Sequence, residues 1–388
     1  MADGSKNKEI FTEYKDGERI YEKNFYSDGK KVECFYKKDK CIHAILYGID
    51  GSKKSEQFFE YKDDSCIYSL YISTDGDKCE EFYEDGNCVH KIDYSADGNK
   101  KEETFTEYKE GKRVYEITHY ADGQKLEYFY DNNLNCVHKI DYNADGSKSE
   151  RFYEGLNCIH EIDYSSDGNK EKEIFTDFEG FRRVHELTSF ADGSKEEKFF
   201  DEHDNRVRMI RYTANGKKKL EEFYENHWNC VHKIEYSTDG EKEKEIFTDY
   251  NGFKRVHETT VFADGSKEER FFDKHDNCIH LIKYAADGKK EEEIFNDYTD
   301  FKQTATYADG SKIESFFDEH GNCIHLIKYT EDGMKEEEFF GEYDRDELVK
   351  LTIKYPDGRK KEEFYENDKL VHSIWYSANG EQESEEFY

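Results

Sequence analysis

The chain repeats one short phrase along its whole length. NCVHKIDYSADG at residues 87–98 returns as NCVHKIDYNADG at 135–146, NCIHEIDYSSDG at 157–168 and NCVHKIEYSTDG at 229–240. An Asp-Gly or Asn-Gly pair follows each strand-like run and recurs every 22 to 25 residues, from Gly4 to Gly380. A period of this length, held throughout a chain, is typical of repeat architectures. The length of 388 residues alone would allow two or three ordinary domains.

A longer period overlies the short one. The segments 98–168, 168–240 and 240–310 align as three super-repeat blocks of three short units each. The blocks contain related phrases, such as FTEYKEGKRVYEITHYADG, FTDFEGFRRVHELTSFADG and FTDYNGFKRVHETTVFADG. No linker or shift in composition divides the chain, so we predict a single continuous array over residues 1–388.

Each unit has the pattern of a β-hairpin. Cys88, His90, Ile92 and Tyr94 alternate with other residues, which predicts a half-buried strand with these four side chains on one face. The Asp-Gly pair supplies the hairpin turn, because glycine accepts a positive φ. An aromatic residue then closes the returning strand; examples are Phe105, Phe152, Phe175, Phe272 and Phe340.

These patterns predict an all-β protein. We expect an elongated array of about 16 antiparallel β-hairpins, arranged as a twisted single-layer ribbon or a β-hairpin superhelix. Runs such as KEKEIF are too short for a helix before the next turn. The chain has 31 tyrosines and 29 phenylalanines but only 35% hydrophobic residues, which favours a thin core of aromatic rings over a deep one.

Charge restricts the class of partner. With 58 basic and 91 acidic residues the formal net charge is −33, which argues against binding nucleic acid or anionic membranes and favours a basic protein partner. No run approaches the ~20 apolar residues of a membrane span, and the start of the chain lacks a signal peptide. Ten cysteines without such a signal predict free thiols in the cytoplasm; surface location or export is the alternative.

The units FYEDGNCVHKIDYSADGNK and FFDKHDNCIHLIKYAADGKK resemble known tandem aromatic hairpin repeats. They are similar to MORN-type and to YD (Rhs-type) repeats in length, in the turn and in the aromatic returning strand. This resemblance implies a scaffold or a binding surface, with catalysis located elsewhere. It carries no functional residue over to this chain.

Seven Cys-x-His pairs raise the question of metal binding. Residues i and i+2 of a strand point the same way, and two successive hairpins together could offer the four ligands of a tetrahedral zinc site. The best candidate set is Cys136, His138, Cys158 and His160. Several units keep the strand without the pair, as at Arg206 and Arg208, so we favour a packing role and expect no metal or other cofactor. A ladder of disulfides between adjacent strands is a third reading.

No motif for catalysis is present. Turns such as SADGNK provide too few oxygens for calcium, and the chain lacks nucleophile, zinc-protease and phosphate-loop motifs. We therefore predict a non-enzymatic structural or interaction protein, an acidic scaffold that assembles end to end through open edge strands, because neither end of the chain has a distinct polar cap. The alternatives are a binding module for a basic protein or a glycan, and a metal-binding array.

Overall fold

The computed structural model describes residues 8–226, 228–367 and 369–388. Within these residues the chain forms 33 β-strands and no helix. The predicted all-β array of hairpins is confirmed. The 33 strands are one more than 16 hairpins contain, so the repeat count differs slightly from the prediction of about 16 hairpins.

The strands belong to two compact units, Met1–Asp192 and Gly193–Tyr388. The strands of the first unit are β1 Lys8–Lys15, β2 Glu18–Tyr26, β3 Lys31–Lys37, β4 Lys40–Tyr47, β5 Lys53–Lys62, β6 Ser65–Ser73, β7 Lys78–Glu84, β8 Asn87–Tyr94, β9 Lys100–Lys109, β10 Lys112–Tyr120, β11 Lys125–Tyr130, β12 Cys136–Tyr142, β13 Lys148–Glu154, β14 Asn157–Tyr164, β15 Lys170–Glu179 and β16 Arg182–Phe190.

The second unit also consists of short strands. They are β17 Lys195–Phe200, β18 Arg206–Tyr212, β19 Lys218–Glu225, β20 Asn229–Tyr236, β21 Lys242–Asn251, β22 Lys254–Phe262, β23 Lys267–Phe272, β24 Cys278–Tyr284, β25 Lys290–Asp297, β26 Lys302–Tyr307, β27 Lys312–Phe317, β28 Cys323–Tyr329, β29 Lys335–Asp344, β30 Glu347–Lys354, β31 Lys360–Glu366, β32 Lys369–Tyr376 and β33 Gln382–Phe387.

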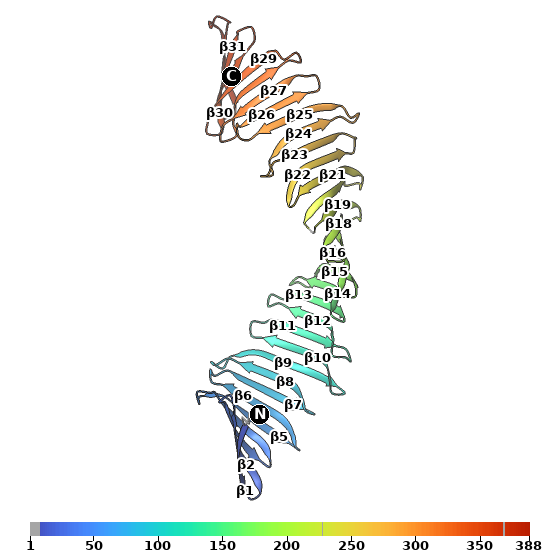
Figure 1. Ribbon diagram of the computed structural model, residues 1–388, viewed down its shortest axis with the longest axis vertical. Coiled ribbons are helices and arrows are strands. Elements are labelled where there is room, and N and C mark those ends of the chain that lie inside the picture. Colours follow the sequence, from blue (N-terminus) through green and yellow to red (C-terminus); the bar gives the residue numbers. More distant parts are fainter. Residues whose placement is uncertain (1–7, 227, 368) are drawn as a thin grey trace, which may run out of the picture. The chain divides into compact units, whose positions relative to one another are not determined.

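Each unit is an antiparallel meander. In the first unit every strand from β1 to β16 hydrogen-bonds to the next, as in the pairs β7–β8 and β8–β9, and the second unit is built in the same way. Among the described strands, the contacts within each unit join chain neighbours only. The strands of a unit therefore form a single layer, in chain order (Figure 1). The grouping into super-repeat blocks stays a prediction.

The Asp-Gly and Asn-Gly pairs that recur every 22 to 25 residues lie at one edge of each sheet, which we call the turn edge: the connections from an even-numbered strand to the next odd-numbered one. In the turn between β8 and β9, the Gly98 N–H donates to the Ser95 carbonyl at 2.8 Å, and the Asp97 carboxylate accepts the Asn99 N–H at 3.2 Å. Gly98 has φ +86, a conformation that glycine adopts without steric cost. The predicted turns are thus confirmed where the structure describes them; Gly4 lies outside the described residues.

We call the opposite edge the loop edge. Near it the strands contain a β-bulge that the sequence pattern did not predict. Across β7 and β8, Phe82 pairs with His90 while Tyr83 pairs with Cys88, so Val89 has no partner. Phe82 and Tyr83 are neighbours and point to opposite faces, and paired residues share a face. The bulge therefore places Cys88 and His90 on opposite faces. The expectation that both lie on one face is wrong.

We call these faces the histidine face, with Phe82, His90 and Phe105, and the cysteine face, with Tyr83 and Cys88. The apolar interior is divided between them. Ile140 is buried on the histidine face, and Met209 on the cysteine face. Neither face is fully buried, because a single layer leaves both faces partly open to water.

Candidate interaction surface

The histidine face carries a ladder of stacked rings. In the first unit, successive strands place Phe129, His138, Phe152, His160 and Phe175 side by side, with centroid distances of 5.0, 4.2, 5.2 and 4.2 Å. The interplanar angles run from 6° to 19°. Each imidazole thus lies nearly flat between two phenyl rings, an arrangement that buries aromatic area without a second layer of structure.

Most histidines of the ladder also face a glutamate on the next strand. Nε2 of His90 lies 2.9 Å from Glu103, and Nε2 of His160 lies 2.9 Å from Glu173. In most of these pairs a lysine three residues before the glutamate binds the same carboxylate, as Lys100 does at 2.5 Å. The lysine hydrogen bond lowers the pKa of Glu103, and the histidine contributes in the same direction. The carboxylate is thereby held in its charged form.

Two positions vary this arrangement. Nε2 of His138 lies 3.7 Å from Glu150 and has no hydrogen-bond partner, and burial lowers the pKa of this imidazole. In the second unit Arg208 takes the place of a histidine: its guanidinium lies 5.4 Å from the ring of Phe223 and binds Glu221. A cation therefore substitutes for an imidazole in the stack, as expected for a packing position rather than for a ligand of a metal.

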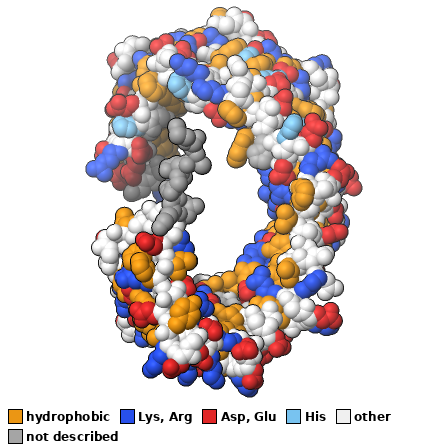
Figure 2. All heavy atoms as spheres, turned by 60° about the horizontal axis from the view of Figure 1, so that its bottom comes forward, with side chains coloured by type: hydrophobic (Ala, Val, Ile, Leu, Met, Phe, Trp, Pro, Cys, Tyr) orange, Lys and Arg blue, Asp and Glu red, His pale blue; other side chains and the backbone are white. Residues whose placement is uncertain are grey.

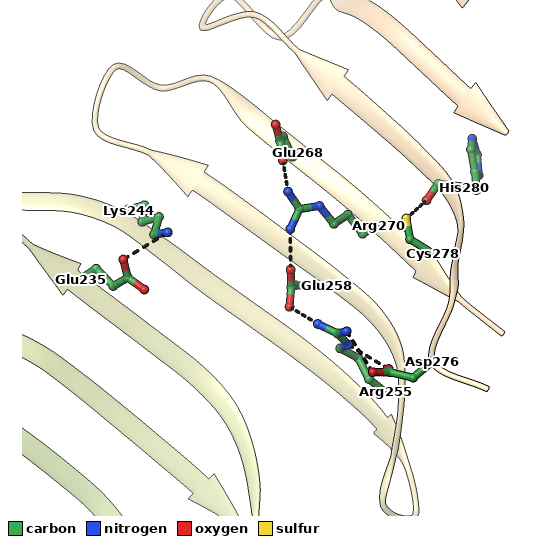
Figure 3. Close-up of polar contacts among 9 residues, drawn as sticks. All are labelled: Glu235, Lys244, Arg255, Glu258, Glu268, Arg270, Asp276, Cys278 and His280. Atoms are coloured by element: carbon green, nitrogen blue, oxygen red, sulfur yellow. Dashed lines mark hydrogen bonds and ion pairs between the residues drawn. The ribbon is translucent and has the colours of Figure 1, made fainter. Parts of the chain in front are cut away.

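The cysteine face carries charges that are paired within the sheet. Arg255 binds Asp276 at 3.1 Å and Glu258 at 3.0 Å, and Arg270 joins Glu258 at 3.2 Å to Glu268 at 2.7 Å (Figure 3). The Arg255 guanidinium also lies 3.8 Å from the ring of Phe272. Such a chain of charges joins successive strands without an apolar layer above them.

The candidate zinc ligands do not converge. Cys136 pairs with Tyr130 and Cys158 with Tyr153 on the cysteine face, while His138 and His160 stack in the ladder on the histidine face. Each thiol donates to the carbonyl of the histidine two residues on, at 3.5 Å for Cys136. The described part of the chain contains no group of three or more residues placed to hold a metal ion.

A row of exposed apolar side chains lies on the loop edge of the first unit. Leu134, Leu156 and Phe181 occupy the tips of three consecutive loops and are 51%, 81% and 80% exposed. Earlier loops of this edge have charged residues or glycine at their tips, for example Asp64 and Gly111. Consecutive loops lie two strands apart, about 10 Å. The three tips therefore present apolar area repeatedly along one edge.

An open hollow of about 900 Å³ lies between the loops of Leu156 and Phe181. The stacked rings of Phe152, His160 and Phe175 line it. The two loops are tied together, because the Asn157 side-chain amide donates to the Gly180 carbonyl. The row of apolar tips thus borders a recess that already exposes aromatic rings.

Carboxylates line this hollow as well. Glu154 and Asp177 line it, and the Asp177 side chain is 72% exposed while it binds His185 at 3.1 Å. Aromatic rings beside exposed carboxylates suit a ligand that is both apolar and cationic.

The second unit has its own apolar loop tips. Trp228, Phe253 and Phe301 are 74%, 78% and 49% exposed. Elsewhere hydrophobic side chains are interspersed with acidic and basic ones on the surface in view (Figure 2). The sequence signal for the tips is a large apolar residue at the centre of a loop, as in EGLN, EGFR and NGFK, where other units have EDGN or KEGK. This signal is a difference between units, so the pattern that the repeats share does not predict it.

Comparison with known proteins gives no family. No protein-family model matches the chain, and no curated protein matches it. Among solved structures, the TcdB2-TccC3-Cdc42 complex is 10% identical with a TM-score of 0.23; the alignment covers 92% of this chain and 24% of that one. The TCP10 domain of Danio rerio CPAP is 17% identical with a TM-score of 0.23, over 59% of this chain and 95% of that domain.

A porin-like protein from Bacteroides uniformis is 10% identical with a TM-score of 0.21, over 62% of this chain and 92% of that one. The chain spans about a quarter of the length of the TcdB2-TccC3-Cdc42 chain that it matches. At these TM-scores the likenesses carry no argument about function. None of the described segments forms a helix with the length and hydrophobicity needed to span a bilayer.

Proposed function

We propose that the chain is a non-enzymatic interaction scaffold, and that the apolar loop tips of its loop edge are contact points for a partner protein. The single observation that carries this proposal is the row of Leu134, Leu156 and Phe181, three large apolar side chains exposed on consecutive loops. Exposed apolar groups that recur along one edge are typical of protein-binding sites in repeat proteins.

The partner that fits this edge is a basic segment with apolar side chains. The net charge of −33 attracts cations over the whole chain, and Glu154 and Asp177 supply carboxylates at the hollow itself. Attraction of charge sets the rate and the orientation of binding, while the apolar tips supply contact area.

A location in the cytoplasm remains part of the proposal; the ten cysteines are free in the structure, as a reducing compartment would keep them.

The test uses two fluorescein-labelled peptides, one of alternating lysine and leucine and one of alternating glutamate and leucine. We expect fluorescence anisotropy to show binding of the lysine peptide that weakens at high salt. Replacing Leu134, Leu156 and Phe181 together by serine should weaken it at least about tenfold, since apolar contacts at a hot spot contribute more than about 1.4 kcal/mol.

The matched control is Leu46→Ser, which replaces a leucine that is 36% exposed on β4, away from these loops. It should leave the affinity unchanged. Equal binding by the triple variant, or failure of the lysine peptide to bind at all, would contradict the proposal.

Glycan binding is the second candidate. The observation that favours it is the half-exposed ring at the end of three ladder segments: Phe175, Phe247 and Phe295 are 44%, 43% and 48% exposed, and exposed rings can stack on sugars. Capture on a glycan array that persists at high salt and is lost in Phe175→Ser would favour this reading over the protein partner.

End-to-end assembly through edge strands also remains a proposal. An edge strand offers unpaired N–H and C=O groups to another copy. Sedimentation velocity over a wide range of protein concentration would test it, and one unchanging species would count against it.

A further inference from the structure

The hairpin of β3 and β4 brings two cysteines together on the cysteine face. Cys41 pairs with Tyr36, which follows Cys34 by two residues and lies on the same face, while Cys34 itself pairs with Ala44. The Cys41 thiol donates to the His43 carbonyl at 3.5 Å, so it lies over the bulged end of the hairpin on the face that carries Cys34. Cys34 and Cys41 are thus neighbours across the hairpin.

Other hairpins show that this proximity is a property of the repeat. In β27 and β28, the residue at the place of Cys34 is Ser315, which lies on the face of Cys323 and opposes the rise in pKa that burial gives this thiol. In β7 and β8, the residue at that place is Glu81, and its charge adds to burial in raising the pKa of the Cys88 thiol. The bulge brings this position to the thiol in each case, and in the β3–β4 hairpin the residue placed there is a second cysteine.

The surroundings of this pair favour a thiolate on Cys34. Interaction with the Cys41 side chain lowers the pKa of Cys34 to about 7, and interaction with Cys34 raises the pKa of Cys41. The Arg19 guanidinium, 3.8 Å from the Tyr36 ring, acts in the same direction on Cys34, whereas Glu22 on β2 opposes it. Both cysteines are half-buried, so small molecules can reach them.

The remaining thiols are different. Burial raises the pKa of other cysteines on this face, including Cys88, Cys136 and Cys158. The thiolate is the nucleophile, so a raised pKa slows the reaction of these thiols with a peroxide.

We propose that Cys34 and Cys41 are a redox-active pair, which a hydroperoxide converts into a disulfide across the β3–β4 hairpin. The Cys34 thiolate attacks one peroxide oxygen, the O–O bond breaks, and hydroxide or an alkoxide leaves, so Cys34 becomes a sulfenic acid. The Cys41 sulfur then attacks the Cys34 sulfur; the S–S bond forms, the S–O bond breaks, and water leaves with the Cys41 proton. The two thiols lose two electrons, and the peroxide gains them.

The test treats the reduced full-length chain with hydrogen peroxide at pH 7 and digests it with trypsin. Cys34 and Cys41 fall in separate tryptic peptides, 32–37 and 41–53. We expect the two peptides to be recovered joined, with the loss of two hydrogen atoms, and to separate on reduction. At a pKa of about 7, half of Cys34 is thiolate against roughly 3% for an ordinary cysteine, and lower nucleophilicity offsets part of this gain; Cys34 should react at least about threefold faster than Cys88.

Three variants make the result decisive. Cys41→Ser should stop the reaction at a sulfenic acid on Cys34, which dimedone traps. Cys34→Ser copies the native Ser315–Cys323 pair, so it should fold, and it should give neither the joined peptides nor the dimedone adduct. Cys79→Ser, in the β7–β8 hairpin, should leave the cross-link unchanged. If the joined peptides are missing while other cysteines oxidise, or if Cys34→Ser loses thiols as fast as the wild type, the proposal is overturned.

Discussion

At the scale of single residues, the histidines act as flat spacers between phenyl rings, and their polar edge determines how much each contributes to stability. His160 stacks between Phe152 and Phe175 and places Nε2 2.9 Å from Glu173. His138 has similar ring neighbours but lacks the hydrogen bond at Nε2. The two histidines therefore form a natural matched pair.

We predict that His160→Phe lowers the free energy of unfolding by about 1 kcal/mol, because a hydrogen bond to a carboxylate is lost while the stack is kept. His138→Phe should be neutral or stabilising by up to about 1 kcal/mol, since it removes a buried polar atom that has no partner. Urea unfolding of both variants and the wild type measures the difference. Equal destabilisation by both substitutions would contradict this account of the ladder.

The glutamates of the ladder predict how stability depends on pH. Hydrogen bonds from lysine and histidine lower the pKa of Glu103, Glu173, Glu245 and Glu293 below the ordinary value of 4.5. A carboxylate whose pKa is lower in the folded state stabilises that state above its unfolded pKa, and the contribution disappears as the pH falls through the folded pKa.

The free energy of unfolding should therefore fall as the pH drops below about 4.5, and Glu173→Gln should reduce the slope in that range. Urea titrations followed by circular dichroism at several pH values measure it. A stability that stays constant or rises between pH 5 and pH 2 would contradict the prediction.

At the scale of the hairpin, the turn edge and the loop edge differ in what the sequence reveals. The turn edge was predicted because Asp97 and Gly98 report directly the conformation that they adopt. The bulge at Val89 was not predicted, because one unpaired residue changes no residue type; it only shifts the register between Phe82 and Tyr83. Alternation alone assigned Cys88 to the face of His90, and the grouping of Cys136 with His138 as candidate zinc ligands rested on the same assignment.

The same reasoning explains the candidate site. The repeat pattern predicted the strands and the aromatic ladder in outline, since hydrophobic period and turn residues are local signals. The hollow beside Phe181 could not be predicted, because it depends on which loops lie next to each other and on the exposure of rings at their base.

Two turn glycines test the packing of neighbouring turns. Gly76 has φ +94, and a methyl group there would lie 3.0 Å from the Ala96 Cβ; Gly98 has φ +86 and open space around it. We predict that Gly98→Ala costs about 1 kcal/mol from backbone strain alone and that Gly76→Ala costs more, because the next turn must also move.

Thermal unfolding of the two variants measures this difference. Gly98→Ala is the control for the strain that both share. A larger loss in Gly98→Ala than in Gly76→Ala would show that the turns do not approach each other as described.

At the scale of the whole chain, contacts between neighbouring strands imply local rather than global cooperativity. Stability of such an array is close to a sum of hairpin terms and nearest-neighbour terms. We predict that Gly76→Ala lowers the hydrogen-exchange protection of β6 to β9 by more than that of strands farther along the chain, and leaves β24 to β32 unchanged. Equal loss of protection in every strand would contradict it.

The central claim is that each hairpin divides its cysteine and its histidine between two faces and that the histidines stack between phenyl rings. The most direct measurement is a nuclear Overhauser experiment on protein labelled at His, Phe and Cys. It should show cross-peaks from the His160 ring to the Phe152 and Phe175 rings, and from the Cys158 β-protons to Tyr153. Cross-peaks from the His160 ring to the Cys158 β-protons, with none to either phenyl ring, would contradict the account.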